Sequence, residues 1–374
     1  MHVSAVDLFC GSGGLTNGLE QAGISVEAGF DVDSDCRFPY EENNDATFLA
    51  RDIGRIAREE PALISEYFDD EADATLLAGC APCQPFSPLT HGTNSADHDK
   101  YGMLRAFLEI VRHTDPDFVV MENVFEIRDS DVYNEFEVGL KELGYNLNPD
   151  TDKRVYCPEY GIPQTRRRWV LVGSRDGRID LGAPSHPNPD DYPTVEDCID
   201  HLPAIEVGET HSEYPLHTAR KLVKENLQRI RQSKPGGDWT DWDEDLLLEC
   251  HKKASGQSYK SVYGRMVANE PAPTITTQFY NLGSGRFGHY DTTQDRALSL
   301  REGAMIQTFS EEYRFVKDLN EVGITKTGRM IGNAVPPKLG EVIGTRVIEF
   351  LEWSDRQSSI SDFDIEAPSS SSLR

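Results

Sequence analysis

Short apolar runs separated by polar or glycine-rich segments dominate the first half of the chain. The runs are four to seven residues long, as is typical of buried strands, and lie at residues 3–9, 25–30, 47–50, 74–78, 117–121 and 169–173. Helical spacing is found at residues 15–22, 102–113 and, near the C-terminus, 338–353. The pattern predicts an α/β fold in which a doubly wound, mostly parallel sheet carries helices on both faces.

The composition changes in the middle of the chain. Between residues 177 and 263, Pro, Asp, His and Glu become frequent, helices are predicted at residues 218–232 and 244–253, and a turn is predicted at residues 235–237. We interpret this stretch as a second, smaller domain. The segment 354–374, which ends in a run of serines, predicts a disordered tail.

The sequence gives no sign of a membrane segment or of a disulfide framework. Its apolar runs are all far shorter than the roughly 20 residues that cross a bilayer, and the N-terminus enters a strand without a basic and apolar leader. The seven cysteines are odd in number and scattered, which fits reduced thiols. We therefore expect a cytoplasmic protein without a membrane partner.

The charge of the chain bears on its partners. A net charge of -27 and a pI near 4.7 argue against nucleic acid, because phosphate binding is usually driven by Lys and Arg. Two interpretations remain. Either the protein does not bind nucleic acid, or it works in concentrated salt, which screens repulsion within about 3 Å at 1 M. Arg outnumbers Lys about two to one, which favours forked contacts to anions.

A glycine-rich loop follows the first predicted strand. Residues 10–14, Cys-Gly-Ser-Gly-Gly, lie between strand 3–9 and helix 15–22, and Asp31 ends the next strand about 20 residues later, where a nucleotide-binding βαβ unit places a carboxylate for ribose hydroxyls. Asp52 follows the third strand. The loop alone is weak evidence because it lacks the complete dinucleotide and phosphate-loop patterns. A tight turn with exposed carboxylates stays an alternative.

The segment 79–87, Gly-Cys-Ala-Pro-Cys-Gln-Pro-Phe-Ser, begins where the apolar run 74–78 ends. In an α/β sheet ligands bind at this edge, which makes its cysteines candidates for a catalytic role. Cys80 and Cys83 also form a Cys-x-x-Cys pair, but no second pair completes a zinc site. The prolines that follow oppose the helix start of a thioredoxin-like motif. We expect no metal.

Two further polar groups adjoin predicted strands. Glu122 follows the run 117–121, so another carboxylate stands at the carboxyl end of a strand. Three consecutive arginines, at residues 166–168, precede the run 169–173. An arginine run is most often a solvated charge patch. Beside a buried strand of an acidic chain, it favours a specific role toward an anion or a base.

Several of these strings occur together in one protein family. Residues 7–14 (Asp-Leu-Phe-Cys-Gly-Ser-Gly-Gly), 82–84 (Pro-Cys-Gln), 122–124 (Glu-Asn-Val), 164–168 (Gln-Thr-Arg-Arg-Arg) and 331–337 (Ile-Gly-Asn-Ala-Val-Pro-Pro) resemble, in order and spacing, motifs of the DNA (cytosine-5)-methyltransferases. The resemblance extends over about residues 3–350 and is weakest within 177–263. It implies a class I methyltransferase fold with a catalytic domain (1–176), a target recognition domain core (177–263), a recognition support and hinge (264–324) and a C-terminal helix that returns to the catalytic domain (325–353).

The resemblance implies S-adenosylmethionine as the cofactor. By this likeness Phe9 lies against the cofactor, Gly11 and Gly13 face its amino-acid moiety, and Asp31 binds its ribose. The complete set of residues implied to contact it is Phe9, Gly11, Gly13, Asp31, Val32, Asp52, Ile53, Pro82, Leu104 and Asn333.

The resemblance also implies a covalent mechanism. Cys83 attacks carbon 6 of a cytosine that has been flipped out of the duplex, while Glu122 binds N3 and the exocyclic amine. Arg168 holds the O2 edge, with Arg166 as its alternate or as support for the Cys83 loop. Gln84, Ser87 and Gln164 are implied to contact DNA.

The partners implied are double-stranded DNA with a short recognition sequence and a possible cognate restriction endonuclease, with the enzyme acting as a monomer. Two alternatives stay open: methylation of tRNA on the same scaffold, and a regulator that binds cofactor or DNA without catalysis. The size of the insert between residues 177 and 263 favours a DNA sequence reader. Intact Cys83, Glu122 and Arg168 speak against a regulator.

Overall fold

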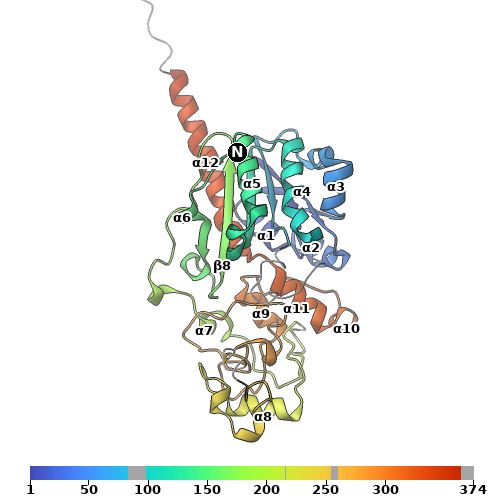
Figure 1. Cartoon of the computed structure of the whole chain (residues 1–374), viewed down its shortest axis with the longest axis vertical. Helices are drawn as coiled ribbons and strands as arrows, with labels where there is room; N and C mark the ends of the chain where they lie inside the picture. The colour runs from blue at the N-terminus through green and yellow to red at the C-terminus, as the bar shows by residue number, and fades with distance from the viewer. Residues whose placement is uncertain (83–97, 215, 254–259, 364–374) are drawn as a thin grey trace, which may run out of the picture.

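The computed structural model describes residues 1–82, 98–214, 216–253 and 260–363. The molecule is elongated, with a larger part built around a sheet and a smaller part formed by the middle of the chain (Figure 1). Helix α12 (Pro337–Phe363) runs along the larger part and extends beyond it. Within the described residues, no helix combines the length and the apolar character needed to cross a bilayer.

The larger part contains an eight-stranded sheet whose strand order is β3-β2-β1-β4-β5-β8-β6, with β7 paired to β8. The strands are β1 (Val3–Leu8), β2 (Ser25–Asp31), β3 (Thr47–Ala50), β4 (Ala74–Gly79), β5 (Phe118–Val124), β6 (Asn146–Leu147), β7 (Arg154–Tyr156) and β8 (Arg167–Ser174). Strands β1 to β5 are parallel to one another, whereas β8 is antiparallel to β5. The predicted mostly parallel sheet is confirmed.

The direction of winding reverses at β1. The chain proceeds from β1 outward through β2 to β3, and β4 then pairs with the opposite side of β1. The carboxyl ends of β1 and β4 therefore lie side by side, with Leu8 opposite Gly79 in the register. Such a switch point leaves a crevice between the loops that follow the two strands, and ligands of α/β proteins bind there.

Helices cover both faces of the sheet, as predicted. One face packs against α1 (Gly14–Gln21), α2 (Arg37–Asn43) and α12, and the other against α3 (Ile53–Glu59), α4 (His98–Thr114) and α5 (Asp131–Glu142), which lie together in Figure 1. Successive residues of a strand point to opposite faces, so Leu76 joins the first core and Leu77 the second. Because both faces are buried, the strands read as continuous apolar runs.

Glycines let α12 lie directly on α1. A Cβ added to Gly18 would lie 2.1 Å from the carbonyl oxygen of Pro337, and one added to Gly340 would lie 2.8 Å from that of Leu15. Any side chain at these positions would force the two helices apart. The C-terminal helix thereby returns to the first helix of the chain.

The sequence prediction was wrong at several boundaries. The helix expected at residues 244–253 is only a 3-10 turn at Glu244–Leu246, because Trp239, Trp242 and Leu246 form a small core and His251 stacks on Trp239 at 4.6 Å. Tertiary packing outweighs helical spacing here.

Two other helices differ in length from the prediction. Helix α8 (Lys224–Gln232) begins six residues later than expected from residue 218, because the carbonyl oxygen of Thr218 accepts a hydrogen bond from the amide of Leu300. Helix α12 continues to Phe363 instead of ending at Trp353, since no Gly or Pro lies between these two residues. The remainder of the predicted tail, residues 364–374, lies outside the described residues.

The smaller part contains short helices and much irregular chain. Besides α8, its regular elements are α7 (Val195–Ile199), α9 (Leu300–Ile306), α10 (Leu319–Val322) and α11 (Ile324–Asn333), the last of which reaches the larger part. Irregular backbone cannot satisfy its own hydrogen bonds, so buried side chains must do so. The Arg265 guanidinium donates to the carbonyl oxygens of Ile230, Ser233, His289, Asp291 and Gln294.

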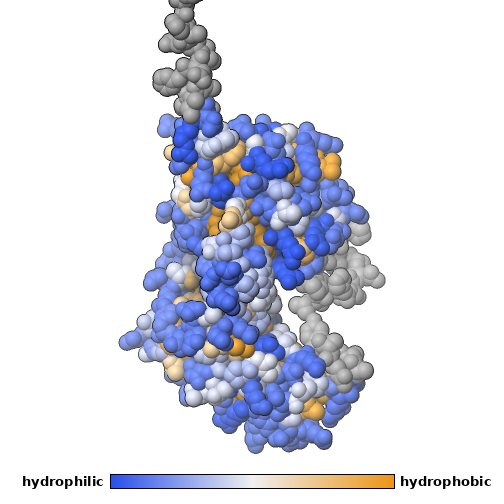
Figure 2. Space-filling model, turned by 90° about the vertical axis from the view of Figure 1, so that its left-hand side faces the viewer, coloured by the Kyte–Doolittle hydropathy of each residue, from blue (hydrophilic) through white to orange (hydrophobic). Residues whose placement is uncertain are grey.

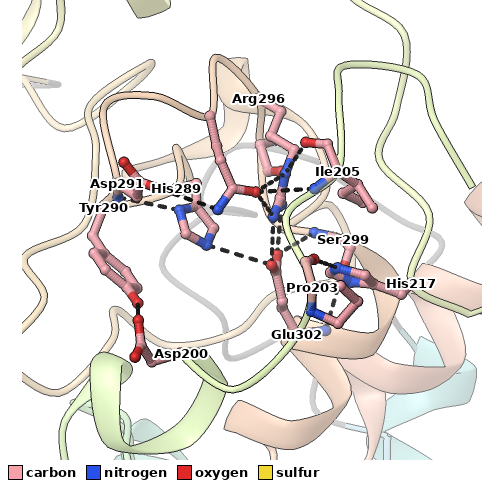
Figure 3. Close-up of polar contacts among 12 residues, drawn as sticks. Asp200, Pro203, Ile205, His217, His289, Tyr290, Asp291, Arg296, Ser299 and Glu302 are labelled. Carbon is pink, nitrogen blue, oxygen red and sulfur yellow. Dashed lines mark hydrogen bonds and ion pairs between the residues drawn. The ribbon is translucent and has the colours of Figure 1, made fainter. Parts of the chain in front are cut away.

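A second buried network surrounds Glu302 (Figure 3). Its carboxylate accepts two hydrogen bonds from Arg296, at 2.7 and 2.8 Å, and one from the amide of Ser299 at 2.7 Å. The His289 ring lies 3.5 Å away. Burial alone would raise the pKa of Glu302, but the charges of Arg296 and His289 outweigh burial and hold this pKa well below its ordinary value.

We expect Glu302→Ala to destabilise the protein by about 3–5 kcal/mol, because it leaves the Arg296 charge buried without its partner. Urea unfolding measures this change. The exposed Glu71→Ala serves as a control that should stay within about 0.5 kcal/mol of the native protein. A loss below about 1 kcal/mol for Glu302→Ala would show that this network contributes little to the free energy of unfolding.

Candidate active site

The glycine-rich loop lies at the carboxyl end of β1. Phe9 and Gly11 have φ angles of 59° and 51°, so the loop turns through left-handed conformations. A bulky residue rarely adopts this conformation, and such strain is typical of functional sites. The loop is fixed by hydrogen bonds from the Cys10 amide to the Phe30 carbonyl oxygen at 3.1 Å and from the Gly11 amide to Asp31 Oδ2 at 2.9 Å.

A cavity of about 230 Å³ opens at the switch point. It contains the predicted cofactor residues Phe9, Gly11, Asp31, Pro82 and Asn333 in its lining. The other lining residues are Asp7, Cys10, Ser12, Leu15, Asp33, Cys36, Cys80, Ala81, Arg329, Met330, Ala334 and Val335. The structure therefore brings together loops that follow β1, β2 and β4 with the end of α11.

The C-terminal segment closes the cavity from one side. A Cβ at Gly14 would lie 2.1 Å from the carbonyl oxygen of Val335, and Ser12 Oγ donates to the Met330 carbonyl oxygen at 3.4 Å. These close contacts hold Asn333 beside the glycine loop. They account for how residues more than 300 positions apart form one site.

The remaining predicted cofactor residues lie outside this lining. Gly13 caps α1, and a Cβ there would lie 2.5 Å from Asn44 Nδ2, so it packs against the protein. Val32 follows Asp31 and is 75% exposed, a position from which an apolar side chain could cover a bound ring. Ile53 and Leu104 are each 3% exposed and belong to the core beneath α3 and α4.

Asp52 also lies away from the cavity. Its carboxylate caps α3 by accepting from the amide of Arg55 at 3.2 Å, and it borders a separate hollow together with Arg58 and Met103. Contacts of Asp52, Ile53 and Leu104 with a cofactor therefore stay predictions.

Sequence reasoning missed Asp7, which lines the cavity and is 1% exposed. Its Oδ2 accepts from Thr16 at 2.8 Å, but its buried Oδ1 has no hydrogen-bond partner among the described residues. Burial raises the pKa of Asp7 to about 7, although Thr16 opposes this shift. An aspartate within the first strand, two residues before the loop, was the available signal.

A second group of polar side chains lies where β4 and β5 end. Gly79 is opposite Met121, which places Cys80 beside Glu122. Cys80 Sγ donates to Glu122 Oε2 at 2.9 Å, and Arg168 Nε lies 2.7 Å from Glu122 Oε1. Glu122 is 1% exposed, so both interactions are formed away from bulk water. Glu122 and Arg168, to which the sequence analysis gave separate contacts with the base, therefore lie side by side, and their roles stay predictions.

The chain that leads to Cys83 is tied to the same edge. Asn123 Nδ2 donates to the carbonyl oxygen of Ala81 at 3.0 Å, two residues before Cys83. Pro82 borders the cofactor cavity. Cys83, Gln84 and Ser87 lie outside the described residues, so their positions and roles stay predictions.

The structure separates the two arginines of the predicted pair. Arg166 is 4% exposed and donates to the carbonyl oxygens of Ile275 and Ala334, both at 3.3 Å. Burial, followed by the neighbouring charge of Arg168, lowers the pKa of Arg166 to about 10. Arg166 therefore joins the start of β8 to the segments around Ile275 and Ala334, and Arg168 is the arginine that contacts Glu122.

The prediction that Gln164 contacts DNA conflicts with the structure. Gln164 is fully buried, and its amide donates to the Ile306 carbonyl oxygen and to Gln307 Oε1 while accepting from the Ile275 amide. Both ends of the side chain are used inside the protein. Gln164 thus holds the segments around Ile275 and Ile306 in place, and its side chain is not available to a DNA base.

Comparison with known proteins now identifies the class. A family model described as C-5 cytosine-specific DNA methylase matches residues 3–349. The type II methylase M.HgiDII of Herpetosiphon aurantiacus is 44% identical over 353 residues, which cover 93% of this chain and 96% of that protein. The type II methyltransferase M1.HphI of Haemophilus parahaemolyticus is 29% identical, with 93% of this chain and 87% of that protein covered.

The chain belongs to the C-5 cytosine-specific DNA methylase family and is a DNA (cytosine-5)-methyltransferase. Solved structures confirm the fold. A putative DNA modification methyltransferase encoded within an Escherichia coli prophage has a TM-score of 0.68 at 20% identity, with 94% of this chain and 99% of that chain covered. A Spodoptera frugiperda DNMT2 mutant has a TM-score of 0.60 at 17% identity, with 92% and 99% covered.

Proposed function

We propose that this enzyme methylates carbon 5 of a cytosine flipped out of double-stranded DNA, within a short recognition sequence, through a covalent adduct of Cys83. The observation that carries the proposal is the edge where Cys80 and Arg168 hold Glu122 while Asn123 ties down the segment before Cys83. A carboxylate fixed in this way, close to the cavity at the switch point, suits recognition of one ring edge.

The chemistry explains why these residue types are needed. Carbon 5 of cytosine is a poor nucleophile until another group adds to carbon 6. A thiolate does this well, because the free thiol of cysteine has a pKa of about 8.5 and can ionise at a suitable site. Glu122 would bind N3 and the exocyclic amine and stabilise protonation there, and Arg168 would hold O2. Once carbon 5 carries the methyl group, loss of its proton to a base re-forms the bond between carbons 5 and 6 as a double bond and expels the Cys83 thiolate from carbon 6.

The cavity fits S-adenosylmethionine, which supplies an electrophilic methyl group when bound. Carboxylates of Asp7, Asp31 and Asp33 line it, and its cation Arg329 is already paired with Asp33 at 2.8 Å. The net negative lining suits a ligand with a sulfonium and an ammonium group. A Cβ at Gly11 would meet no atom within 4 Å, so the loop backbone is open to a ligand.

Cofactor affinity should fall as the pH drops below about 7. A cation near Asp7 favours its charged form, so binding below that pH must release a proton, which weakens binding by up to about tenfold per pH unit. Calorimetric titration at several pH values measures this dependence. Asp7→Asn should bind more weakly and with a flatter pH dependence, and an unchanged slope in this variant would exclude Asp7 as the group responsible.

We further propose that the acidic surface adapts the enzyme to concentrated salt. Hydrophilic side chains cover most of the face shown in Figure 2, and its outline is indented between the larger and smaller parts.

Two exposed arginines lie near the ends of β5 and β8. Arg154 lies over the ring of Phe125 and Arg167 over that of Tyr156, and neither pairs with a carboxylate within the described residues. Such arginines are available to DNA phosphates.

The smaller part would read the recognition sequence while the larger part carries out catalysis. Relatives that span nearly the whole chain are named type II methylases or methyltransferases, which supports a cognate restriction endonuclease as a partner in the same cell. We propose that the methyltransferase itself acts as a monomer.

A duplex that carries 5-fluorocytosine tests the covalent step. Fluorine cannot leave as a cation, so the adduct at carbon 6 should persist and migrate as a protein–DNA complex in denaturing gels. Peptide mapping should place the linkage on Cys83. Turnover of ordinary duplex DNA without any trapped adduct would contradict the covalent mechanism.

A further inference from the structure

We propose that Cys80 is a positioning residue of the methyl-transfer reaction: its thiol holds the Glu122 carboxylate in the orientation that recognises the cytosine ring. The inference rests on the proposed function, because Glu122 acts on the base only if cytosine is the substrate. It concerns the other cysteine of the Cys-x-x-Cys pair, which forms no bond with the cytosine in the mechanism above.

The sheet register brings the two side chains together. Strands β4 and β5 are parallel, with Gly79 opposite Met121, and each chain continues by one residue to Cys80 and Glu122. The Cys80 amide also donates to the Leu8 carbonyl oxygen at 3.3 Å, which anchors its backbone to β1. The thiol therefore projects from a backbone that is hydrogen-bonded to the central strand β1, so the position of the sulfur can change little.

The contacts of Glu122 come from two directions. Cys80 Sγ lies 2.9 Å from Oε2, and Arg168 Nε lies 2.7 Å from Oε1. Arg168 contributes an ion pair, while Oε1 has no hydrogen-bond partner among the described residues, so the hydrogen bond from Cys80 to Oε2 orients the carboxylate. Because Glu122 is 1% exposed, water cannot readily replace a partner that is removed.

The same geometry gives the two cysteines different tasks. A thiolate at Cys80 would place a second negative charge against the Glu122 carboxylate, so Cys80 stays protonated and acts as a hydrogen-bond donor. A thiol that stays protonated is a poor nucleophile, because the thiolate is the attacking form. The pair therefore divides into Cys80, which orients the carboxylate, and Cys83, which attacks.

Cys80 also borders the cofactor cavity, whereas Glu122 does not line it. Cys80 thus forms part of the wall of the cofactor site and also contacts the carboxylate that recognises the base. A change at this position should disturb the step in which the two substrates react more than the binding of either one.

The test compares Cys80→Ala, Cys80→Ser and Cys250→Ala. Cys250 is exposed in the smaller part of the molecule and is not among the residues that line the cavity, so its alanine variant is the matched control. We expect Cys80→Ala to lower kcat by about 10- to 100-fold, as for the loss of a hydrogen bond to a charged group, with KM for DNA and cofactor changed less than about threefold. Serine keeps a donor, so Cys80→Ser should recover most of this loss.

The pH profile of kcat provides a readout that a general structural defect would not produce. Loss of a donor to the carboxylate disfavours its charged form, so the midpoint of the profile should move to higher pH in Cys80→Ala. The midpoint should stay in place in Cys80→Ser and Cys250→Ala. Calorimetric cofactor binding confirms that each variant is folded.

Normal kcat and an unmoved midpoint in Cys80→Ala would overturn the inference, as would an equal loss in Cys80→Ser. These outcomes leave the proposed function intact, because the native enzyme still methylates DNA. A native enzyme without any methyl transfer to cytosine would instead overturn the proposed function and this inference with it.

Discussion

Cys83→Ser should reduce methyl transfer by about 10⁴-fold or more, as is usual when a catalytic nucleophile is removed. A serine hydroxyl ionises far less readily than a thiol and cannot add efficiently to carbon 6 of cytosine. Cofactor affinity should change less than about twofold, since Cys83 is not among the residues predicted to contact the cofactor. Transfer of a radiolabelled methyl group to duplex DNA measures the first effect, and calorimetry the second.

Cys250→Ser is the matched control, because this cysteine is exposed in the smaller part of the molecule and far in sequence from the catalytic edge. Its activity should equal that of the native enzyme. If Cys83→Ser retained full transfer, the nucleophile would have to be another residue, and the likeness of residues 82–84 to the family motif would have misled us.

Glu122→Gln should lower kcat by about 10²- to 10⁴-fold, the range expected when a group that assists proton placement is lost. Glutamine keeps the size of the side chain but carries no negative charge, so it neither stabilises protonation at N3 nor pairs with Arg168. The variant should still bind DNA and cofactor. Single-turnover kinetics with saturating DNA isolates this step from binding.

Glu126→Gln is the corresponding control, because Glu126 is exposed in the turn that directly follows β5. It should be fully active. An effect of Glu122→Gln on KM alone, with kcat unchanged, would mean that Glu122 contributes equally to the ground state and the transition state, contrary to the proposed role.

Much of the fold could be predicted because strands buried on both faces produce apolar runs that stand out from their polar surroundings. Runs ending near Leu8, Asp31 and Gly79 predicted β1, β2 and β4 within about two residues. The smaller part could not be predicted in this way. Its chain is held by side chains such as Arg265, whose partners lie on segments scattered along the sequence.

The sequence analysis placed its candidate residues after predicted strands, and the structure places Asp31, Cys80 and Glu122 at strand ends. Glu122 and Arg168 lie together because β5 and β8 are antiparallel neighbours, and this pairing was not part of the sequence prediction. What the sequence could not reveal is how similar residues divide their tasks. Arg166 and Gln164 belong to the same short motif, yet both point into the hinge, because the carbonyl oxygens that they satisfy come from residues 275–334.

Asp7 is a residue whose position at the cavity the sequence did not reveal. An aspartate within an apolar strand is expected to be paired when it is buried, and Thr16 supplies one partner. Only the structure reveals that Asp7 lines a cavity and that its buried second oxygen has no hydrogen-bond partner among the described residues. Such a signal depends on three-dimensional packing, so it had no counterpart in the linear pattern.

The central claim is tested most directly by bisulfite sequencing of mixed-sequence duplex DNA after incubation with the protein and S-adenosylmethionine, from about 0.1 M to several molar salt. The account predicts that cytosines in one short sequence context resist conversion, with the greatest protection at high salt. If no cytosine is protected at any salt by protein that binds the cofactor, duplex DNA is not the substrate under these conditions and the proposed function is contradicted.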